Sequence, residues 1–161
     1  MKFSQFEDTK KLEEEINECI SYLNGFLWFD TQEKQHFILP KLNLIICSGI
    51  DVYLFLDVTK EYRSNKKLLT RVAALLYIFI NATILKLGLS KLFLKDILLK
   101  SSDFYPVIIG GNNRLRFVDS SNSNALLIAK NSGSLLFTKN AMRAYCMSGF
   151  SDLNIIPAII P

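Results

Sequence analysis

The chain has 161 residues, of which 50% are hydrophobic and 21% are charged. This composition excludes an intrinsically disordered chain and supplies enough apolar side chains for one compact domain over residues 1–161. The net charge is +4, but it is unevenly spread. Residues 1–60 hold 6 basic against 10 acidic residues, residues 61–100 hold 8 against 2, and residues 101–161 hold 5 against 3. An acidic N-terminal segment followed by a basic central segment is typical of a surface that contacts a partner, and equally of two solvated faces.

A mean hydropathy of +0.22 makes a membrane span the first alternative to test. The longest charge-free run in the most apolar segment is Val72–Leu85, 14 residues between Arg71 and Lys86. Because a span needs about 20 residues, we expect a buried core helix here and no membrane span. The first 15 residues lack the apolar run of a secretory signal, which favours a cytoplasmic location.

The first predicted element is an amphipathic helix that begins at Asp8 or Thr9 and ends at Asn24-Gly25. Its apolar side chains recur at helical spacing, at Leu12, Ile16, Cys19, Ile20 and Leu23. After it come short apolar or alternating runs separated by polar, glycine or proline breaks, which predict an antiparallel meander. The expected strands are Phe26–Phe29, His36–Leu39, Leu42–Cys47 and Val52–Val58, with a turn at Ser48–Asp51.

From about Asn65 the apolar period changes to that of a helix, which is nearly apolar all round in its middle and is therefore expected to be buried. Gly88 and Ser90 separate it from a second helical piece at Lys91–Leu99. Glycine and asparagine at 110–113 then predict a hairpin over Val107–Val118. A loop at Ser120–Asn124, a strand at Ala125–Ala129 and a turn at Asn131–Ser134 follow.

This order predicts an α+β fold with a single domain. Its antiparallel sheet, a meander plus a hairpin, is expected to pack against the N-terminal amphipathic helix and a long buried central helix.

Residue types that carry chemistry are sparse. His36 is the single histidine, no Cys-x-x-Cys pair occurs, and the three cysteines stand apart among apolar neighbours. No hydrolase elbow, phosphate loop or metal-binding helix motif is present, so we expect no catalytic residue, no cofactor and no metal. The alternative is an enzyme whose site is assembled from distant residues such as His36, Asp51, Asp57 and a tyrosine.

Two charged clusters are candidates for contact with a partner. The acidic cluster lies on the first helix and comprises Glu13, Glu14, Glu15 and Glu18. The basic cluster lies near the start of the central helix and comprises Arg63, Lys66, Lys67 and Arg71. Cations near the N-terminus of a helix are unfavourable, because the helix dipole is positive there. The basic cluster therefore suggests a role other than helix stability. The sequence contains no nucleic-acid-binding motif, so a protein partner is favoured over nucleic acid.

The C-terminal residues 135–160 have the most complete set of signals for where a helix and its flanking strands begin and end. A strand ends at Phe137, Thr138 can cap a helix that carries Met142 and Tyr145, Gly149 ends it, and an apolar segment closes with Ile156-Pro157. This unit resembles the C-terminal part of one group of immunity proteins from bacterial polymorphic toxin systems.

The resemblance implies a small cytoplasmic protein without catalytic activity, whose partner is a cognate toxin domain. Either charged cluster would then make the contact, the acidic one against a basic toxin surface and the basic one against an acidic surface. A further alternative is a scaffold subunit that uses the apolar helix Leu68–Leu85 to pair with another chain. The oligomeric state stays open.

Overall fold

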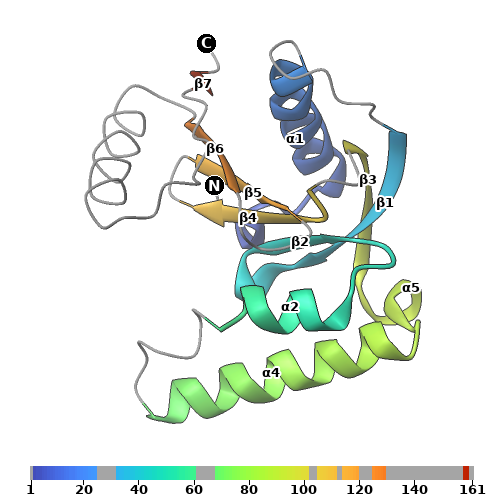
Figure 1. Cartoon of the computed structure of the whole chain (residues 1–161), viewed down its shortest axis with the longest axis vertical. Helices are drawn as coiled ribbons and strands as arrows, with labels where there is room; N and C mark the ends of the chain where they lie inside the picture. The colour runs from blue at the N-terminus through green and yellow to red at the C-terminus, as the bar shows by residue number, and fades with distance from the viewer. Residues whose placement is uncertain are drawn as a thin grey trace.

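The computed structural model describes residues 2–24, 32–60, 68–101, 105–111, 114–119, 125–129 and 158–159. It confirms an α+β fold in which helices surround one largely antiparallel sheet (Figure 1). The strand order is β3-β1-β2-β4-β5-β6-β7. Every neighbouring pair from β3 to β6 is antiparallel, and only the two-residue β7 joins β6 in parallel. The strands are β1 (Gln32–Leu39), β2 (Leu44–Cys47), β3 (Lys95–Ser101), β4 (Val107–Gly111), β5 (Arg114–Val118), β6 (Ala125–Ala129) and β7 (Ala158–Ile159).

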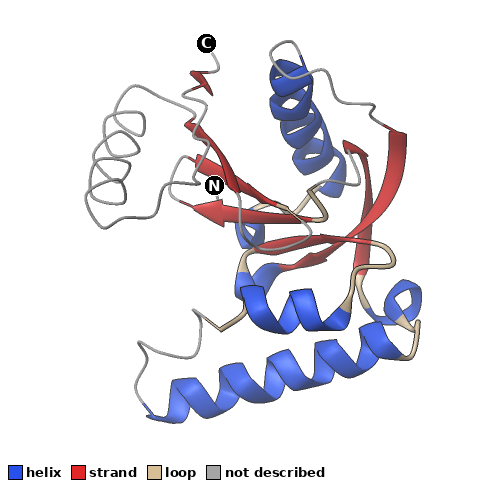
Figure 2. Ribbon diagram, viewed as in Figure 1, coloured by secondary structure: helices blue, strands red, loops and turns tan. Residues whose placement is uncertain are grey.

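Helices cover both faces of this sheet (Figure 2). Helix α1 (Thr9–Asn24) lies on one face, and α2 (Val52–Val58) lies on the other, with α4 (Leu68–Lys86) packed outside α2. Alternate strand residues therefore enter different cores: Ile45 belongs to the cluster under α1, whereas Leu44 and Ile46 belong to the cluster under α2. Because both faces are covered, β2 is apolar at every position, Leu-Ile-Ile-Cys, and buried throughout.

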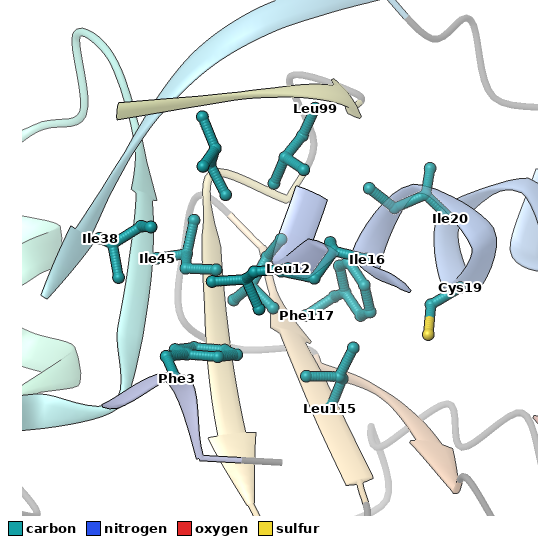
Figure 3. Close-up of a cluster of buried hydrophobic side chains, with 12 residues drawn as sticks. Phe3, Leu12, Ile16, Cys19, Ile20, Ile38, Ile45, Leu99, Leu115 and Phe117 are labelled. Atoms are coloured by element: carbon teal, nitrogen blue, oxygen red, sulfur yellow. The ribbon is translucent and has the colours of Figure 1, made fainter. Parts of the chain in front are cut away.

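The core under α1 confirms the predicted amphipathic helix and its start at Thr9. Leu12, Ile16, Cys19 and Ile20 are all buried, and they pack against Ile45 and other residues of the sheet (Figure 3). Phe3, from the short 3₁₀ helix η1 (Phe3–Gln5), joins the same cluster. The carboxylate of Asp8 accepts a hydrogen bond from the Lys10 backbone N–H at 2.9 Å, which satisfies one of the free donors at the helix start.

The predicted strand at Val52–Val58 is wrong, because these residues form helix α2. Asp51 caps the helix: its carboxylate accepts a hydrogen bond from the Tyr53 N–H at 3.0 Å. The buried side chains are Leu54, Phe55 and Val58, a helical spacing within a run that is apolar almost throughout. The preceding turn is confirmed, with Gly49 at a positive φ of 81°.

The central helix α4 exists as predicted, but the expectation that it is buried is wrong. Its inner side packs against α2 and the sheet core through Ile78, Ala82 and the partly buried Leu85. Its outer side is uncovered by the described residues: Leu69 is 86% exposed and Phe79 is 69% exposed. The helix has two apolar sides, and the fold of the described chain uses one of them.

The predicted helical piece at Lys91–Leu99 is also largely wrong. Helix α5 covers only Ser90–Phe93, and β3 starts at Lys95. Along β3, Ile97 and Leu99 are buried while Asp96, Leu98 and Lys100 are exposed, which is the two-residue period of a strand. Pairing with β1, such as Phe37 with Asp96, imposes this conformation.

The other predicted strands fare better. β1 contains the predicted His36–Leu39 and extends back to Gln32, whereas the predicted strand at Leu42–Cys47 begins only at Leu44, after the 3₁₀ helix η2 (Pro40–Leu42). The hairpin is confirmed as β4 and β5, with Gly111 paired to Arg114, and the strand at Ala125–Ala129 is confirmed as β6. The predictions for 26–29, 120–124 and 131–134 lie outside the described residues, as does the C-terminal unit apart from β7.

Candidate interaction surfaces

The acidic cluster of α1 divides into residues with different roles. Glu13 faces β3, where its carboxylate accepts a hydrogen bond from the Leu98 backbone N–H at 3.2 Å. Asn17, one turn later, accepts from the Lys100 N–H at 2.9 Å and donates to the Leu98 carbonyl at 3.3 Å. Since β3 is the edge strand of the sheet, these side chains occupy backbone groups that another strand would otherwise pair with. Glu13 therefore serves the fold.

Glu14 and Glu18 are exposed on α1, and Glu15 is partly buried. Glu18 lies beyond the first turn of the helix, and the residues three and four positions before it are Glu15 and Glu14. Like charges at these spacings destabilise a helix by a few tenths of a kcal/mol. Helix stability thus does not account for Glu14 and Glu18 together at the surface.

The basic cluster is mostly outside the described residues, which contain only Arg71 of its four members. Arg71 is exposed in the first turn of α4, on the opposite side of the sheet from α1 (Figure 1). The structure therefore places the described parts of the two charged clusters on opposite sides of the molecule.

The residues considered for an assembled enzyme site have structural surroundings. His36 is fully buried in β1 and its Nδ1 lies 2.9 Å from the Lys34 carbonyl oxygen. Burial lowers the pKa of His36 and outweighs the backbone hydrogen bond with Lys34, which raises it, while the positive charge of Lys34 adds a smaller lowering effect. Asp51 caps the start of α2, and Asp57, in its last turn, forms an ion pair with Lys60.

One carboxylate–tyrosine neighbourhood escaped the sequence analysis. Asp119, directly after β5, is buried, and Tyr105, just before β4, is partly buried against the core under α1. Burial raises the pKa of the Tyr105 hydroxyl, and the negative charge of Asp119 raises it further. The pairing of Val107 with Val118 brings the two ends together, a proximity that only the strand register could have revealed.

The largest departure from an ordinary surface lies on α4 and the residues after it. Of the eleven large apolar side chains that are exposed in the described residues, nine lie between Leu69 and Phe93. Helix α4 is also long and apolar enough to cross a membrane by length and composition alone. Only 17% of the window Leu69–Lys86 is buried, so the helix is not a core helix of the described fold. A concentrated exposed apolar surface marks a site of interaction with protein or membrane.

Within the described ranges, no three His, Cys, Asp or Glu side chains gather in a way that could hold a metal ion. Cys19 and Cys47 are both buried. Comparison of the chain with protein-family models, with curated proteins and with solved structures finds no match.

Proposed function

We propose that this chain is a non-enzymatic immunity protein that binds and neutralises a cognate bacterial toxin domain in the cytoplasm. The observation that carries the proposal is the sequence of residues 137–159, with its Thr138 cap, Gly149 stop and Ile156-Pro157 ending. The resemblance of this unit to immunity proteins implies binding without chemistry. The α+β fold of the described residues is compatible with such a binding protein, although fold alone does not assign a function.

The surroundings of Asp51, Asp57 and His36, the residues considered for an assembled site, also favour binding over catalysis. A catalytic site needs groups that converge on a reacting atom. Asp51 and Asp57 belong to opposite ends of α2, about 9 Å apart along the helix axis, and each has a structural role there. The buried His36 contacts the backbone of its own strand. These roles account for the three residues without a reaction.

For the toxin contact, the proposal selects the exposed side of α1 with Glu14 and Glu18. Their like charges cost helix stability, and they point to a basic partner surface. The proposal leaves Glu13 out of the contact, because its carboxylate accepts a hydrogen bond from the Leu98 N–H of β3. An acidic surface facing a basic toxin also steers association, which speeds capture of the toxin.

Co-expression tests the proposed function. The proposal predicts that a toxin domain is encoded next to this chain. That domain is produced in a sensitive bacterial host with and without this protein, and survival is counted. The proposal predicts that cells survive only when the protein is present, and that the purified proteins form a complex. Failure of the parent protein to rescue these cells contradicts the proposal.

Charge-reversal variants test the position of the contact. The double variant Glu14→Lys, Glu18→Lys is expected to lose rescue and to bind the toxin at least tenfold more weakly, mainly through slower association. The matched control is Arg71→Glu, a charge reversal on the opposite side of the molecule, which is expected to rescue fully. If only the control variant loses rescue, the contact lies near Arg71, and the proposed use of α1 is wrong.

A second candidate function is that of a scaffold subunit that pairs with another chain through α4. The exposure of Leu69, Leu76 and Phe79 specifically favours it. Pairing through α4 leaves α1 uncovered, so the two functions do not exclude each other.

A further inference from the structure

We propose that the outer side of α4 pairs with the same helix of a second copy of this chain, in an antiparallel arrangement about a twofold axis. The surface concerned, called here the α4 seam, consists of Leu69, Ala73, Leu76, Ile80, Thr83 and Leu87, the last being the residue after the helix. All six are exposed in the described chain. The inference rests on the second candidate function, for which it names a second copy of this chain as the partner, and it does not depend on any toxin.

The spacing of the seam is that of helix pairing. Its residues follow one another at intervals of four, three, four, three and four, which average 3.6, the period of a straight α-helix. Apolar residues at this period keep one line of a helix facing a partner helix over many turns. Val72 and Phe79 flank the same line and are 57% and 69% exposed, which broadens the apolar surface on one side.

The seam is also self-complementary in the antiparallel direction. Its order of side chains is Leu, Ala, Leu, Ile, Thr, Leu, so it reads nearly the same from either end. With the helices crossing level with Ile78, Leu69 lies opposite Leu87 of the second copy, and Leu76 lies opposite Ile80. The small Ala73 then lies opposite the small Thr83. A twofold interface requires such a pattern, because the same patch must fit itself.

The composition of the seam suits burial between two copies. None of its six residues is charged, and charged residues are depleted at the centre of interfaces between identical chains. Its single polar group is already satisfied: the Thr83 hydroxyl donates a hydrogen bond to the Phe79 carbonyl at 2.9 Å. Arg71 and Lys86 lie about a quarter-turn or more from the seam, so neither cation must be buried.

Sedimentation of the purified full chain over a range of concentrations tests the proposal. The expected result is a dimer that dissociates on dilution. The variant Leu76→Glu, Ile80→Glu places four charges at the centre of the dimer and is expected to weaken self-association at least a hundredfold. Both side chains are exposed in the single chain, so a circular dichroism spectrum like that of the parent is expected from the variant.

The matched control is Thr70→Glu, which adds a charge at an exposed position of α4 about a quarter-turn from the seam and is expected to leave the dimer intact. A parent protein that stays monomeric at high concentration overturns the proposal, and so does a dimer that the double variant leaves unchanged. A monomer that instead floats with phosphatidylglycerol-containing vesicles, and no longer does so after Leu76→Glu, assigns the seam to a membrane and also overturns it.

Discussion

Single polar side chains fix several features that the apolar pattern leaves ambiguous. The run Val52–Val58 is apolar enough for a strand or a helix, and the hydrogen bond from the Tyr53 N–H to Asp51 favours the helix. An Asp before an apolar run is a known helix-start signal, so helix α2 could have been predicted from the sequence. By contrast, the contacts of Glu13 and Asn17 with β3 join residues more than 80 positions apart, and no local pattern indicates them.

His36 gives a prediction for stability against pH. Burial lowers the pKa of His36 below its usual 6.5, so the unfolded chain binds a proton more readily than the folded one. The free energy of unfolding is therefore expected to be constant above about pH 7 and to fall as the pH drops below about 6.5. The slope is at most about 1.4 kcal/mol per pH unit, and it ends once the folded state also becomes protonated. Urea denaturation between about pH 7.5 and 5 measures it.

The control for this measurement is His36→Gln, which keeps a polar side chain but cannot titrate in this range. Because the chain has a single histidine, the slope between about pH 6.5 and 5 is expected to be largely lost in the variant. An unchanged slope in His36→Gln assigns the pH dependence to other groups and contradicts this account of His36.

At the level of elements, exposure and pairing depend on neighbours that the sequence does not identify. The two-residue period of Lys95–Ser101 can be recognised once the strand is known. In the sequence, no glycine or proline separates it from the helical pattern that precedes it. Helix α4 is predicted correctly as a helix because its period is long and regular. The burial of α4 was not predicted correctly. A pattern of apolar residues shows which sides of a helix are apolar, but not whether the same chain covers them.

The contact between α1 and β3 gives the prediction at this scale. The variant Asn17→Ala removes two hydrogen bonds from the sheet edge, to Leu98 and Lys100, and is expected to lower the free energy of unfolding by about 1 kcal/mol. Urea denaturation checks the loss. Glu14→Ala, an exposed change on the same helix, is the control and is expected to change stability by less than about 0.5 kcal/mol. Equal stability of the parent and Asn17→Ala contradicts a role for Asn17 at this edge.

For the whole molecule, the fold class was predictable, and the layering was predictable only in part. The apolar runs of β1 and β2 indicate strands, and the two-core arrangement explains why Ile45 and Ile46 are both fully buried although they face opposite ways. Helices α1 and α4 lie on opposite sides of the sheet (Figure 1), which separates the exposed Glu14 and Glu18 from the apolar outer side of α4. In the proposed account, one side meets a toxin while the opposite side meets a second copy.

Disulfide trapping tests the antiparallel α4 pair most directly. The variants Leu69→Cys and Leu87→Cys are prepared separately, mixed and oxidised, with the parent protein as a control for its own cysteines. The account predicts a disulfide-linked dimer of the two different variants and little linkage of Leu87→Cys with itself, because the two copies of residue 87 lie about 27 Å apart along an antiparallel pair. Strong self-linkage of Leu87→Cys, or no linkage in the mixture, contradicts the antiparallel seam.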